Sequence, residues 1–421
     1  MSDAPARADH DRDLVQRRTV RVLMVSVVPA GMAMAGGFAG AAVLAEEITG
    51  SDTLAGLAAA THSVGGALAT VPLARLAARR GRRPGLRTGW GLAAVGASLA
   101  FAAAVAELYP LLLLGVLGVG AGNATNLAAR YAAADLAPEG RQARAIGLLV
   151  WAVTVGSVLG PTLALGPAGG FAELIGLPEL AGPYLLSALG FAAAASVVER
   201  FLRPDPLEVA GSIDVPGTRR PPVRDSFRAL WRSPTARLAV FTMGLGQAVM
   251  VGIMTMTPLH MKDGNHELRV IGFVISVHIL GMYACSPIVG WLVDRLGPHP
   301  VIALGGVTLF IGAELASHTD PEDRLGIFVG LFLIGLGWSF GLISASALLA
   351  GAADVTDRVA VQGAADLVMV GSGAAAGLLA GAVVEWTSFH SLSHWAGVAA
   401  LALVAVAGRT YFTRSRVPTP S

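Results

Sequence analysis

Hydrophobic residues along this chain gather in long, almost uninterrupted runs, and most charged residues lie in the stretches between them. Runs of about 18 or more apolar residues are typical of membrane-spanning helices, because about 20 residues are needed to cross a hydrocarbon core of about 30 Å. Such segments must be helical, since lipid offers no hydrogen-bond partner to open backbone groups. The pattern therefore predicts twelve membrane helices, at about 20–45, 53–78, 85–106, 109–134, 143–167, 181–201, 236–260, 269–293, 298–316, 325–350, 360–384 and 389–412.

The same pattern occurs twice, with an offset of 216 residues between the two copies. Histidine inside an apolar run is uncommon, so the match of His62 with His278 carries weight. The offset also pairs Arg21 with Arg237, Met34 with Met250, Gly36 with Gly252, Gly65 with Gly281, Leu76 with Leu292, Arg79 with Arg295, Gly81 with Gly297, Pro84 with Pro300, and Gly147 with Gly363. A duplicated apolar unit indicates a transporter built from two repeats around a central site.

The repeats set the predicted domain organisation. We expect an N-terminal arm (1–19), a first six-helix bundle (20–202), a Pro-rich polar linker (203–235), a second six-helix bundle (236–413) and a tail (414–421). At the end of the linker, Phe227, Leu230 and Trp231 follow helical spacing among arginines. This spacing fits a short interfacial helix, and an irregular linker is the alternative.

Composition agrees with this all-α integral membrane fold, since 54% of the residues are hydrophobic and only 14% are charged. Basic residues crowd the N-terminal arm, the loop near Arg79 and the central linker, whereas the opposite side has only Lys262, Arg269 and Arg324. Positive charge marks the cytoplasmic side. We therefore expect both termini and the linker in the cytoplasm and the protein in the cell membrane. The net charge of +2 is a signal of topology on this interpretation, and no nucleic-acid partner is expected.

Few other features of the chain indicate chemistry. The first apolar run is too long for a signal peptide and is read as a retained helix. Cys285 is the only cysteine, which excludes a disulfide within the chain, and the nine histidines are scattered along it. We expect no metal, no cofactor, no catalytic residues and a monomer in the lipid bilayer.

One loop motif carries a family resemblance. After the predicted eighth helix the chain runs Gly290, Trp291, Leu292, Val293, Asp294, Arg295, Leu296 and Gly297. This run resembles the loop motif of the major facilitator superfamily, and the six-plus-six layout extends the resemblance over nearly the whole chain. The corresponding first-half loop keeps Gly81, Arg82 and Arg83 but has Ala78 where the family usually has aspartate.

Both loops need a tight turn, which Gly81 and Gly297 allow because glycine tolerates positive φ. The resemblance implies that Asp294 faces the positive N-terminus of the fifth helix, near Arg141 and Arg144, and forms a cytoplasmic latch. The alternative is a loop that only sets topology. Gly81, Arg82, Arg83, Gly290, Asp294, Arg295 and Gly297 are the gating residues on this interpretation.

The fifth helix carries a second resemblance, through the spacing of Gly147, Gly156, Gly160 and Pro161. This spacing is similar to a motif of antiporters in the superfamily, although Ala164 and Leu165 replace its closing glycine pair. Small residues allow close approach of helices and proline bends them. In contrast, the arginine of the family's fourth-helix motif aligns with Val116, so proton coupling has to lie elsewhere or be absent.

Asp366 is the strongest candidate for proton coupling. A central charge in a membrane helix costs about 2.5–3.5 kcal/mol on insertion scales, so it needs a reason, and a structural ion pair is the alternative to transport. Asn123, Asn126 and Arg130 form a polar stripe on the fourth helix. We expect Arg130 to pair with Asp366 across a closed inner gate; the alternative is that Arg130 reaches lipid phosphate.

His62 and His278 are further candidates for proton coupling, because imidazole titrates near neutral pH. Packing residues inherited from the duplication are the alternative. For the substrate, flexible methionine suits a cavity that adapts to varied apolar ligands. The resemblance implies that helices 1, 4, 7 and 10 line this cavity, which predicts the contact residues Asn123, Asn126, Met243, Gln247, Met250, Met254 and Trp338. A methionine stripe that only packs is the alternative.

The sequence thus predicts a secondary transporter that exports small amphipathic or hydrophobic compounds in exchange for protons by alternating access. Alternatives are a proton-coupled metabolite importer, a lipid flippase and a non-transporting membrane receptor. An enzyme is not expected, since no nucleophile–base pair is evident. The glutamates near predicted helix ends, including Glu314, are interpreted as solvated loop residues.

Overall fold

The computed structural model describes residues 3–211, 223–264, 268–320, 324–352 and 358–414, which are helical with short connections and contain no strand. Twelve of the helical segments in these ranges are long and apolar enough to cross a membrane. The chain divides into two compact units that do not follow the sequence halves strictly. Unit 1 comprises 1–138, 152–227 and 353–367, and unit 2 comprises 139–151, 228–352 and 368–421.

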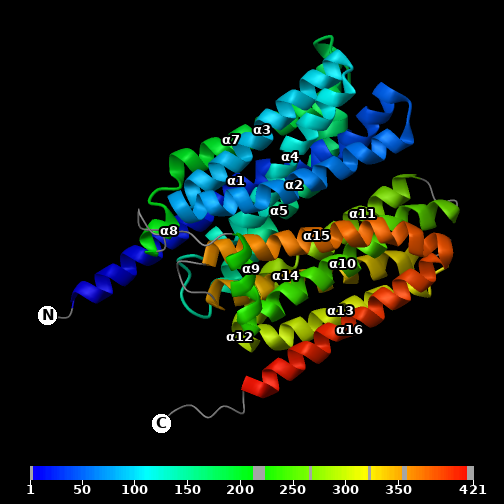
Figure 1. Cartoon of the computed structure of the whole chain (residues 1–421). Helices are drawn as coiled ribbons and strands as arrows, with labels where there is room; N and C mark the ends of the chain where they lie inside the picture. Colours follow the sequence, from blue (N-terminus) through cyan, green and yellow to red (C-terminus); the bar gives the residue numbers. More distant parts are fainter. Residues whose placement is uncertain (1–2, 212–222, 265–267, 321–323, 353–357, 415–421) are drawn as a thin grey trace. The chain divides into compact units, whose positions relative to one another are not determined.

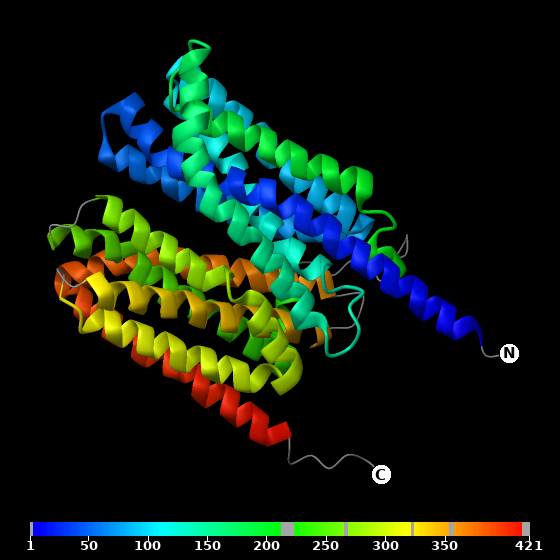
Figure 2. The same ribbon diagram turned by 180° about the vertical axis from the view of Figure 1, so that it is seen from behind.

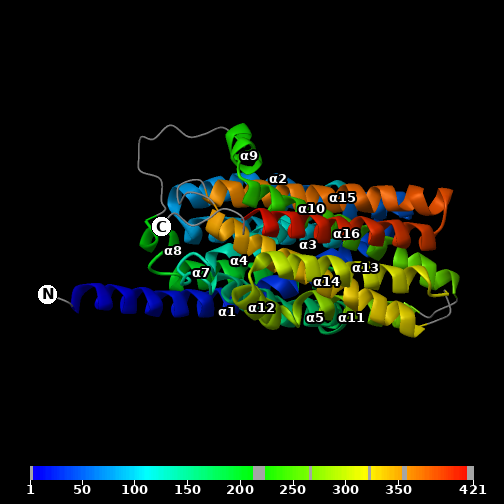
Figure 3. The ribbon, with the colours of Figure 1, turned by 90° about the horizontal axis from the view of Figure 1, so that it is seen from below.

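Unit 1 is built mainly from the first half of the chain, whose long helices run alongside one another (Figure 1). Its elements are α1 (Asp3–Thr49), α2 (Asp52–Arg80), α3 (Arg82–Ala106), α4 (Tyr109–Ala132), the later part of α5 (Gln142–Leu163), η1 (Ala164–Ala168), α6 (Gly169–Leu174), α7 (Ala181–Phe201), α8 (Pro206–Val209) and the beginning of α15 (Arg358–Trp386). The N-terminal end of α1 projects beyond α2 and α3, which Figure 3 also shows. Helix α1 thus begins well before the predicted residue 20.

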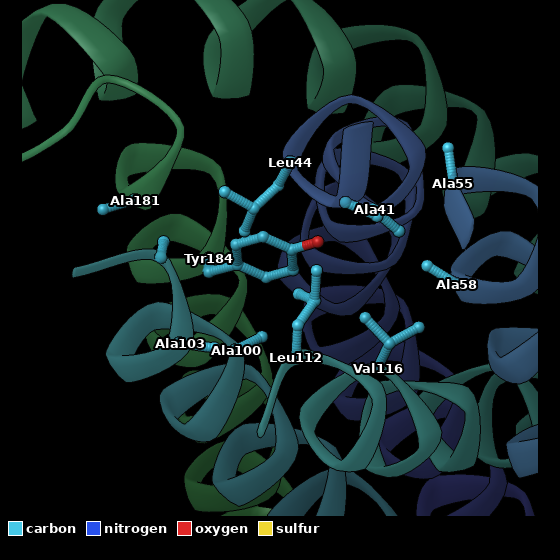
Figure 4. Close-up of a cluster of buried hydrophobic side chains, with 12 residues drawn as sticks. Ala41, Leu44, Ala55, Ala58, Ala100, Ala103, Leu112, Val116, Ala181 and Tyr184 are labelled. Carbon is cyan, nitrogen blue, oxygen red and sulfur yellow. The ribbon is translucent and has the colours of Figure 1, made fainter. Parts of the chain in front are cut away.

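A buried cluster at one end of unit 1 shows how its helices pack (Figure 4). The ring of Tyr184 on α7 lies between Leu44 of α1 and Leu112 of α4, and all three side chains are buried. Most of the surrounding residues are alanines. Small side chains let the helix backbones approach closely. Dispersion contacts between the closely packed helices then hold them together.

Unit 2 holds most of the second half of the chain, and Figure 2 shows α13 and α16 side by side within it. Its elements are the beginning of α5, α10 (Pro234–Asp263), α11 (Leu268–Tyr283), α12 (Ser286–Leu296), α13 (Pro298–Ser317), α14 (Arg324–Ala352), the remainder of α15 and α16 (Phe389–Arg414). Helix α9 (Val223–Arg232) contains the boundary between the units, and a helix was one of the two expectations for this stretch.

The duplication is visible in how each unit packs its second helix against its fourth. In unit 1, a Cβ atom on Gly120 would collide with the carbonyl oxygen of His62. In unit 2, a Cβ atom on Gly335 would collide with the carbonyl oxygen of His278. Each histidine therefore marks a helix crossing that is close enough to require glycine on the facing helix.

Two predicted helices differ in the structure, and proline lies at both differences. The predicted helix 143–167 ends its α-helical part at Leu163 and continues through a π-helical turn that contains Pro167. The predicted helix 269–293 is interrupted between Tyr283 and Ser286, just before Pro287. Proline has no N–H and crowds the preceding turn, so the helix widens or breaks at such points.

The two family-like loops share one backbone geometry. Gly81 joins α2 to α3 with φ of 98°, and Gly297 joins α12 to α13 with φ of 83°. These positive values confirm that both turns favour glycine. Residues 212–222 of the predicted linker and 415–421 of the predicted tail lie outside the described residues.

Candidate coupling site

A buried ion pair joins α4 to α15 inside unit 1. The guanidinium Nη2 of Arg130, in the last turn of α4, lies 2.5 Å from Oδ1 of Asp366, and Nη1 lies 3.5 Å from Oδ2. Arg130 is 2% exposed and Asp366 is 3% exposed. Both residues lie within candidate membrane spans, where a charge is tolerated only with a partner. The structure therefore brings together the two residues expected to pair.

Tyr131 and the α4 backbone complete the surroundings of this pair. The Tyr131 hydroxyl donates to Oδ1 of Asp366 at 3.4 Å and accepts from Nη2 of Arg130 at 3.1 Å. Nη1 of Arg130 donates to the carbonyl of Leu127, and the guanidinium carbon lies 4.3 Å from the centroid of the Tyr131 ring. Hydrogen bonds, charge and a ring face thus hold the guanidinium in one orientation, as a buried charge requires.

A second buried ion pair lies beside the first. Nε and Nη2 of Arg82, at the start of α3, donate to the two carboxylate oxygens of Asp135 at 2.7 and 3.1 Å. Nη2 also donates to Oε1 of Gln362 on α15 at 2.8 Å. This fork-to-carboxylate geometry is the strong form of an arginine–carboxylate contact. Asp135 has no counterpart in the sequence expectations, and its position among alanines after α4 was the available signal.

A small cavity is lined by one member of each ion pair, Arg82 and Asp366. Its volume is about 20 Å³. Its polar lining comes from α2, α3, α4 and α15, through Thr70, Arg82, Thr125, Tyr131, Gln362 and Asp366. The remaining lining is apolar and includes Ala74, Ala77 and Val359. Two arginines, two aspartates and a cavity therefore lie next to one another inside the unit.

The first-half loop has Ala78 at the family's aspartate position, and an aspartate from a distant segment contacts this loop. Asp205, which precedes α8, accepts hydrogen bonds from the backbone N–H groups of Arg82, Arg83 and Leu207 at 3.1, 2.8 and 3.0 Å. A carboxylate at the first N–H groups of a helix satisfies unpaired donors and the helix dipole. Asp205 thus anchors the start of α3, a role that its sequence position did not suggest.

In unit 2, Asp294 of α12 accepts from the backbone N–H groups of Ala143 and Arg144 at the start of α5, both at 3.1 Å. A Cβ atom on Gly290 would meet the carbonyl oxygen of Ala143, so the two helices are in close backbone contact. The neighbouring Arg295 lies over the ring of Trp291, at 5.2 Å from its centroid. Asp294 therefore lies at the helix start that the family resemblance implies.

The glycines of α5 also lie at close helix contacts. Gly147 faces the carbonyl of Ser286 on α12, in unit 2. Gly156 and Gly160 face the backbone of α1 near Met32, in unit 1. A Cβ atom at any of these glycines would collide with main-chain atoms, which explains the small residues without reference to a mechanism.

The symmetry-related histidines differ in their hydrogen bonds. His278 is buried and its Nδ1 donates to the carbonyl of Leu331 at 2.8 Å. His62 is also buried, but its Nδ1 has no hydrogen-bond partner among the described residues. Its ring meets Phe38 edge-on, at a centroid distance of 5.3 Å. The two repeats thus share a histidine at this position, but the hydrogen bonds of the two histidines differ.

Asn126, one of the predicted substrate contacts in unit 1, accepts a hydrogen bond from the Trp90 indole at 2.9 Å. Its amide nitrogen lies 3.6 Å from the sulfur of Met34. Asn123 is half-buried near Gly66. The polar stripe of α4 is therefore partly occupied by contacts inside the unit.

Unit 2 has a related arrangement on α10 and α14. The indole of Trp338 donates to Oε1 of Gln247 at 2.7 Å, and the Tyr283 ring meets Trp338 edge-on at 5.9 Å. Met243 and Met250 are buried, whereas Gln247 and Met254 are half-buried. Two aromatic rings and an amide thus lie together, with methionines on the same helix.

Four of the nine histidines gather at one end of unit 2, contrary to the scatter in the sequence. Glu314 is not a solvated loop residue: it lies within α13, where His394 Nδ1 donates to its carboxylate at 2.8 Å and His318 Nδ1 lies at 3.5 Å. His390 donates to the carbonyl of Ser317, and its ring meets His260 edge-on. These residues come from α10, α13 and α16, so only the fold brings them together.

Comparison with known proteins agrees with this architecture. The chain is 38% identical over 393 residues to the uncharacterized MFS-type transporter YdeG of Bacillus subtilis (strain 168), covering 93% of this chain and 91% of that one. It is 28% identical over 413 residues to the riboflavin transporter RfnT of Brucella anthropi, covering 96% of each. The crystal structure of the human organic anion transporter MFSD10 (TETRAN) matches with a TM-score of 0.72 at 16% identity, over 93% of this chain and 99% of that one.

The profile of the Major Facilitator Superfamily matches residues 22–267 and 240–421, which together cover nearly the whole chain. The chain therefore belongs to the major facilitator superfamily and is a multi-pass membrane transporter.

Proposed function

We propose that the protein exports small amphipathic compounds from the cell in exchange for protons, by alternating access, with Asp366 as the proton-carrying residue. The observation that carries this proposal is the buried pair of Arg130 and Asp366. It joins a helix of the first repeat to a helix of the second repeat, and protonation would remove the charge of one partner.

The energetics of a buried ion pair support this role. Two apposed charges in a low-dielectric interior compensate each other, and neutralising one of them leaves the other unpaired at a cost of about 3–5 kcal/mol. Proton binding at Asp366 would therefore weaken the hold of α4 on the first turns of α15. This free energy is large enough to change the balance between two conformations of a transporter.

His62 and His278 are second candidates for proton binding. Both are buried, and His62 has the unpartnered Nδ1 among the described residues. Neither histidine has a charged partner in the hydrogen bonds and ion pairs described above. Asp366 is the leading candidate because its protonation would change an existing ion pair.

The proposed substrate contacts favour a flat, aromatic compound with polar edges. Trp338 and Tyr283 offer ring surfaces, and Gln247 offers an amide. Asn126 and Met34 provide an amide and a thioether in unit 1. Each of these surfaces, within its own unit, suits compounds that have one apolar face and a few hydrogen-bonding groups.

Gating in this proposal involves both family-like loops. Asp294 holds the start of α5, and Asp205 holds the start of α3. We place both loops and both chain ends on the cytoplasmic side of the cell membrane, on the basis of the arginine distribution.

The test uses inside-out vesicles, an imposed proton gradient and ethidium as the lipophilic cationic probe. Gradient-driven uptake of ethidium by the native protein, lost in Asp366→Asn, is the expected result. Glu385→Gln is the matched control, because Glu385 is an exposed carboxylate near the other end of the same helix. Exchange of labelled for unlabelled ethidium without a gradient should persist in Asp366→Asn.

Uptake that survives Asp366→Asn would reject Asp366 as the coupling residue and move the test to His62→Asn and His278→Asn. Uptake that does not depend on the gradient in the native protein would reject proton exchange altogether.

A second function, import of flavin-like heterocycles, is favoured by the full-length similarity to the riboflavin transporter. The two functions differ in direction. Uptake of labelled riboflavin into intact cells would favour import, whereas uptake into inside-out vesicles would favour export.

A further inference from the structure

We propose that the small cavity beside Gln362 binds one water molecule, and that Gln362 positions this water to deliver protons to Asp366. The inference deepens the proposed function, since it rests on Asp366 being the proton carrier. It assigns a positioning residue and a water site that the ion pairs alone do not require.

The bonding of Gln362 gives the first reason. Its side chain is 2% exposed, and its Oε1 accepts from Nη2 of Arg82. Its Nε2 has no acceptor among the described residues. A buried amide donor without a partner is destabilising because it has lost its hydrogen bond to water, so a partner at this position stabilises the site.

The size of the cavity gives the second reason. Gln362 and Asp366 are one helical turn apart on α15, and both line the cavity. Its volume is about 20 Å³, and about 10–15 Å³ of such space holds one water molecule. A metal cation is disfavoured because Arg82 and Arg130 lie at the site.

The cavity also provides enough polar groups to hold a water. Thr70 and Thr125 line it, and their hydroxyl groups donate to Gly66 and Ala121 within their own helices. Their oxygen lone pairs are therefore available as acceptors. With Nε2 of Gln362 as donor and the Asp366 carboxylate as acceptor, the site reaches the two to four partners that a buried water needs.

Apolar residues close one side of the cavity. Val359 of α15, Ala77 of α2 and Leu207 of α8 form a buried cluster there, and Val359 and Ala77 also belong to the lining. Protons do not cross such a cluster, so in this proposal a proton reaches Asp366 from the polar side of the cavity.

The proposed proton transfer needs only the water and the Asp366 carboxylate. The water accepts an incoming proton on its lone pair and passes another of its protons to an oxygen of Asp366. The water is regenerated, the carboxylate becomes a neutral carboxyl group, and the positive charge of Arg130 loses its partner. Before and after the transfer, Nε2 of Gln362 donates to the water oxygen and so orients the water.

The test measures protonation and hydrogen–deuterium exchange of the Asp366 carboxyl group by infrared difference spectroscopy on the purified full-length protein in lipid. No transported compound is needed. Asp366→Asn identifies the band. Gln362→Met removes the amide, and Ala124→Val fills the cavity while it leaves the bond between Arg82 and Gln362 in place.

In the native protein, we expect fast hydrogen–deuterium exchange of the Asp366 carboxyl proton, seen as a shift of its band. Exchange should slow by about tenfold or more in both Gln362→Met and Ala124→Val, because the proton then has to wait for a local opening of the structure. Gln16→Met is the control for loss of a buried glutamine, since Gln16 donates to the carbonyl of Ala133 and does not line the cavity. It should leave the exchange rate unchanged.

Two outcomes would overturn the inference. Unchanged exchange in Ala124→Val, with or without an effect of Gln362→Met, would reject the water route. Absence of any titrating band from Asp366 would reject the route together with the proposed coupling residue. The failures are distinguishable, because loss of gradient-driven transport in Asp366→Asn combined with normal exchange in both cavity variants would leave the proposed function intact.

Discussion

Arg130 and Asp366 lie 236 positions apart in the chain, and their side chains meet at 2.5 Å inside a compact unit of the protein. The segment that carries Asp366 comes from the second repeat, yet it packs with the first.

Removing one partner of the ion pair should lower the free energy of unfolding more than removing both partners. Asp366→Leu or Arg130→Met leaves a buried charge unpaired, so either should lower the free energy of unfolding by about 3–5 kcal/mol. The loss of unfolding free energy in the double variant should be well below the sum of the losses in the two single variants. Denaturant unfolding in detergent measures all three values, and additive costs would contradict the idea that the two charges compensate each other.

The crossing of α2 and α4 should not tolerate a methyl group. A Cβ atom on Gly120 would collide with main-chain atoms of α2, so Gly120→Ala should destabilise unit 1 by about 1–3 kcal/mol. Gly335→Ala should destabilise unit 2 by a similar amount, at the related crossing of α11 and α14. Gly91→Ala is the control, since a Cβ atom there meets no neighbouring atom within 4 Å. Comparable melting temperatures for Gly120→Ala and Gly91→Ala would argue against the packing described.

The two symmetry-related histidines should respond differently to leucine. His278→Leu removes a hydrogen bond to Leu331 and should cost about 1 kcal/mol. His62→Leu removes a buried nitrogen that has no partner in the described structure, so stability should be unchanged or higher. Thermal unfolding in detergent distinguishes the two. An equal loss in both variants would mean that the bonding of His62 resembles that of His278.

The proposed orientation predicts which surfaces meet the outside of the cell. In a Cys285→Ser background, Lys262→Cys should react with a membrane-impermeant maleimide on intact cells. Arg87→Cys, at a half-exposed side chain, should react only after the membrane is permeabilised. The reverse labelling pattern would show that the arginine-rich side faces outward.

The indole N–H of Trp338 should contribute to ligand binding through Gln247. Trp338→Phe keeps an aromatic ring and removes the donor, so Gln247 loses its orientation. We expect riboflavin, used as an aromatic probe, to bind about fivefold more weakly, equivalent to a hydrogen bond of about 1 kcal/mol. Trp395→Phe is the control, because that indole is exposed. Quenching of riboflavin fluorescence reports binding, and an equal effect of both variants would remove Trp338 from the proposed site.

Much of the fold could be predicted from the chain because membrane helices follow from local composition. Twelve apolar runs predicted twelve spans, and the 216-residue offset predicted the repeat. Proline effects were harder to locate, as the π-helical turn at Pro167 and the break before Pro287 show. A helix can bend, widen or stop at proline, and neighbouring helices decide which of these occurs.

The candidate site was predictable only in part. A charge in an apolar run identified Asp366, since such a residue is costly without a purpose. Asp135, Asp205 and Glu314 gave no comparable signal, because each lies near a helix end, where carboxylates are common. Their partners come from distant segments, so only tertiary packing shows that they are paired.

The sequence by itself determined that this protein spans the membrane twelve times, as two related halves, and that it resembles the major facilitator superfamily. The spans and the two halves depend on hydrophobicity and periodicity, which are local along the chain, and the resemblance depends on the loop motif from Gly290 to Gly297. The tertiary structure decided which polar residues share a site: it placed Gln362 between Arg82 and a cavity, and it separated the bonding of His62 from that of His278. Ion pairs and cavities depend on distances of a few ångströms between segments hundreds of residues apart, and only the packing of helices sets those distances.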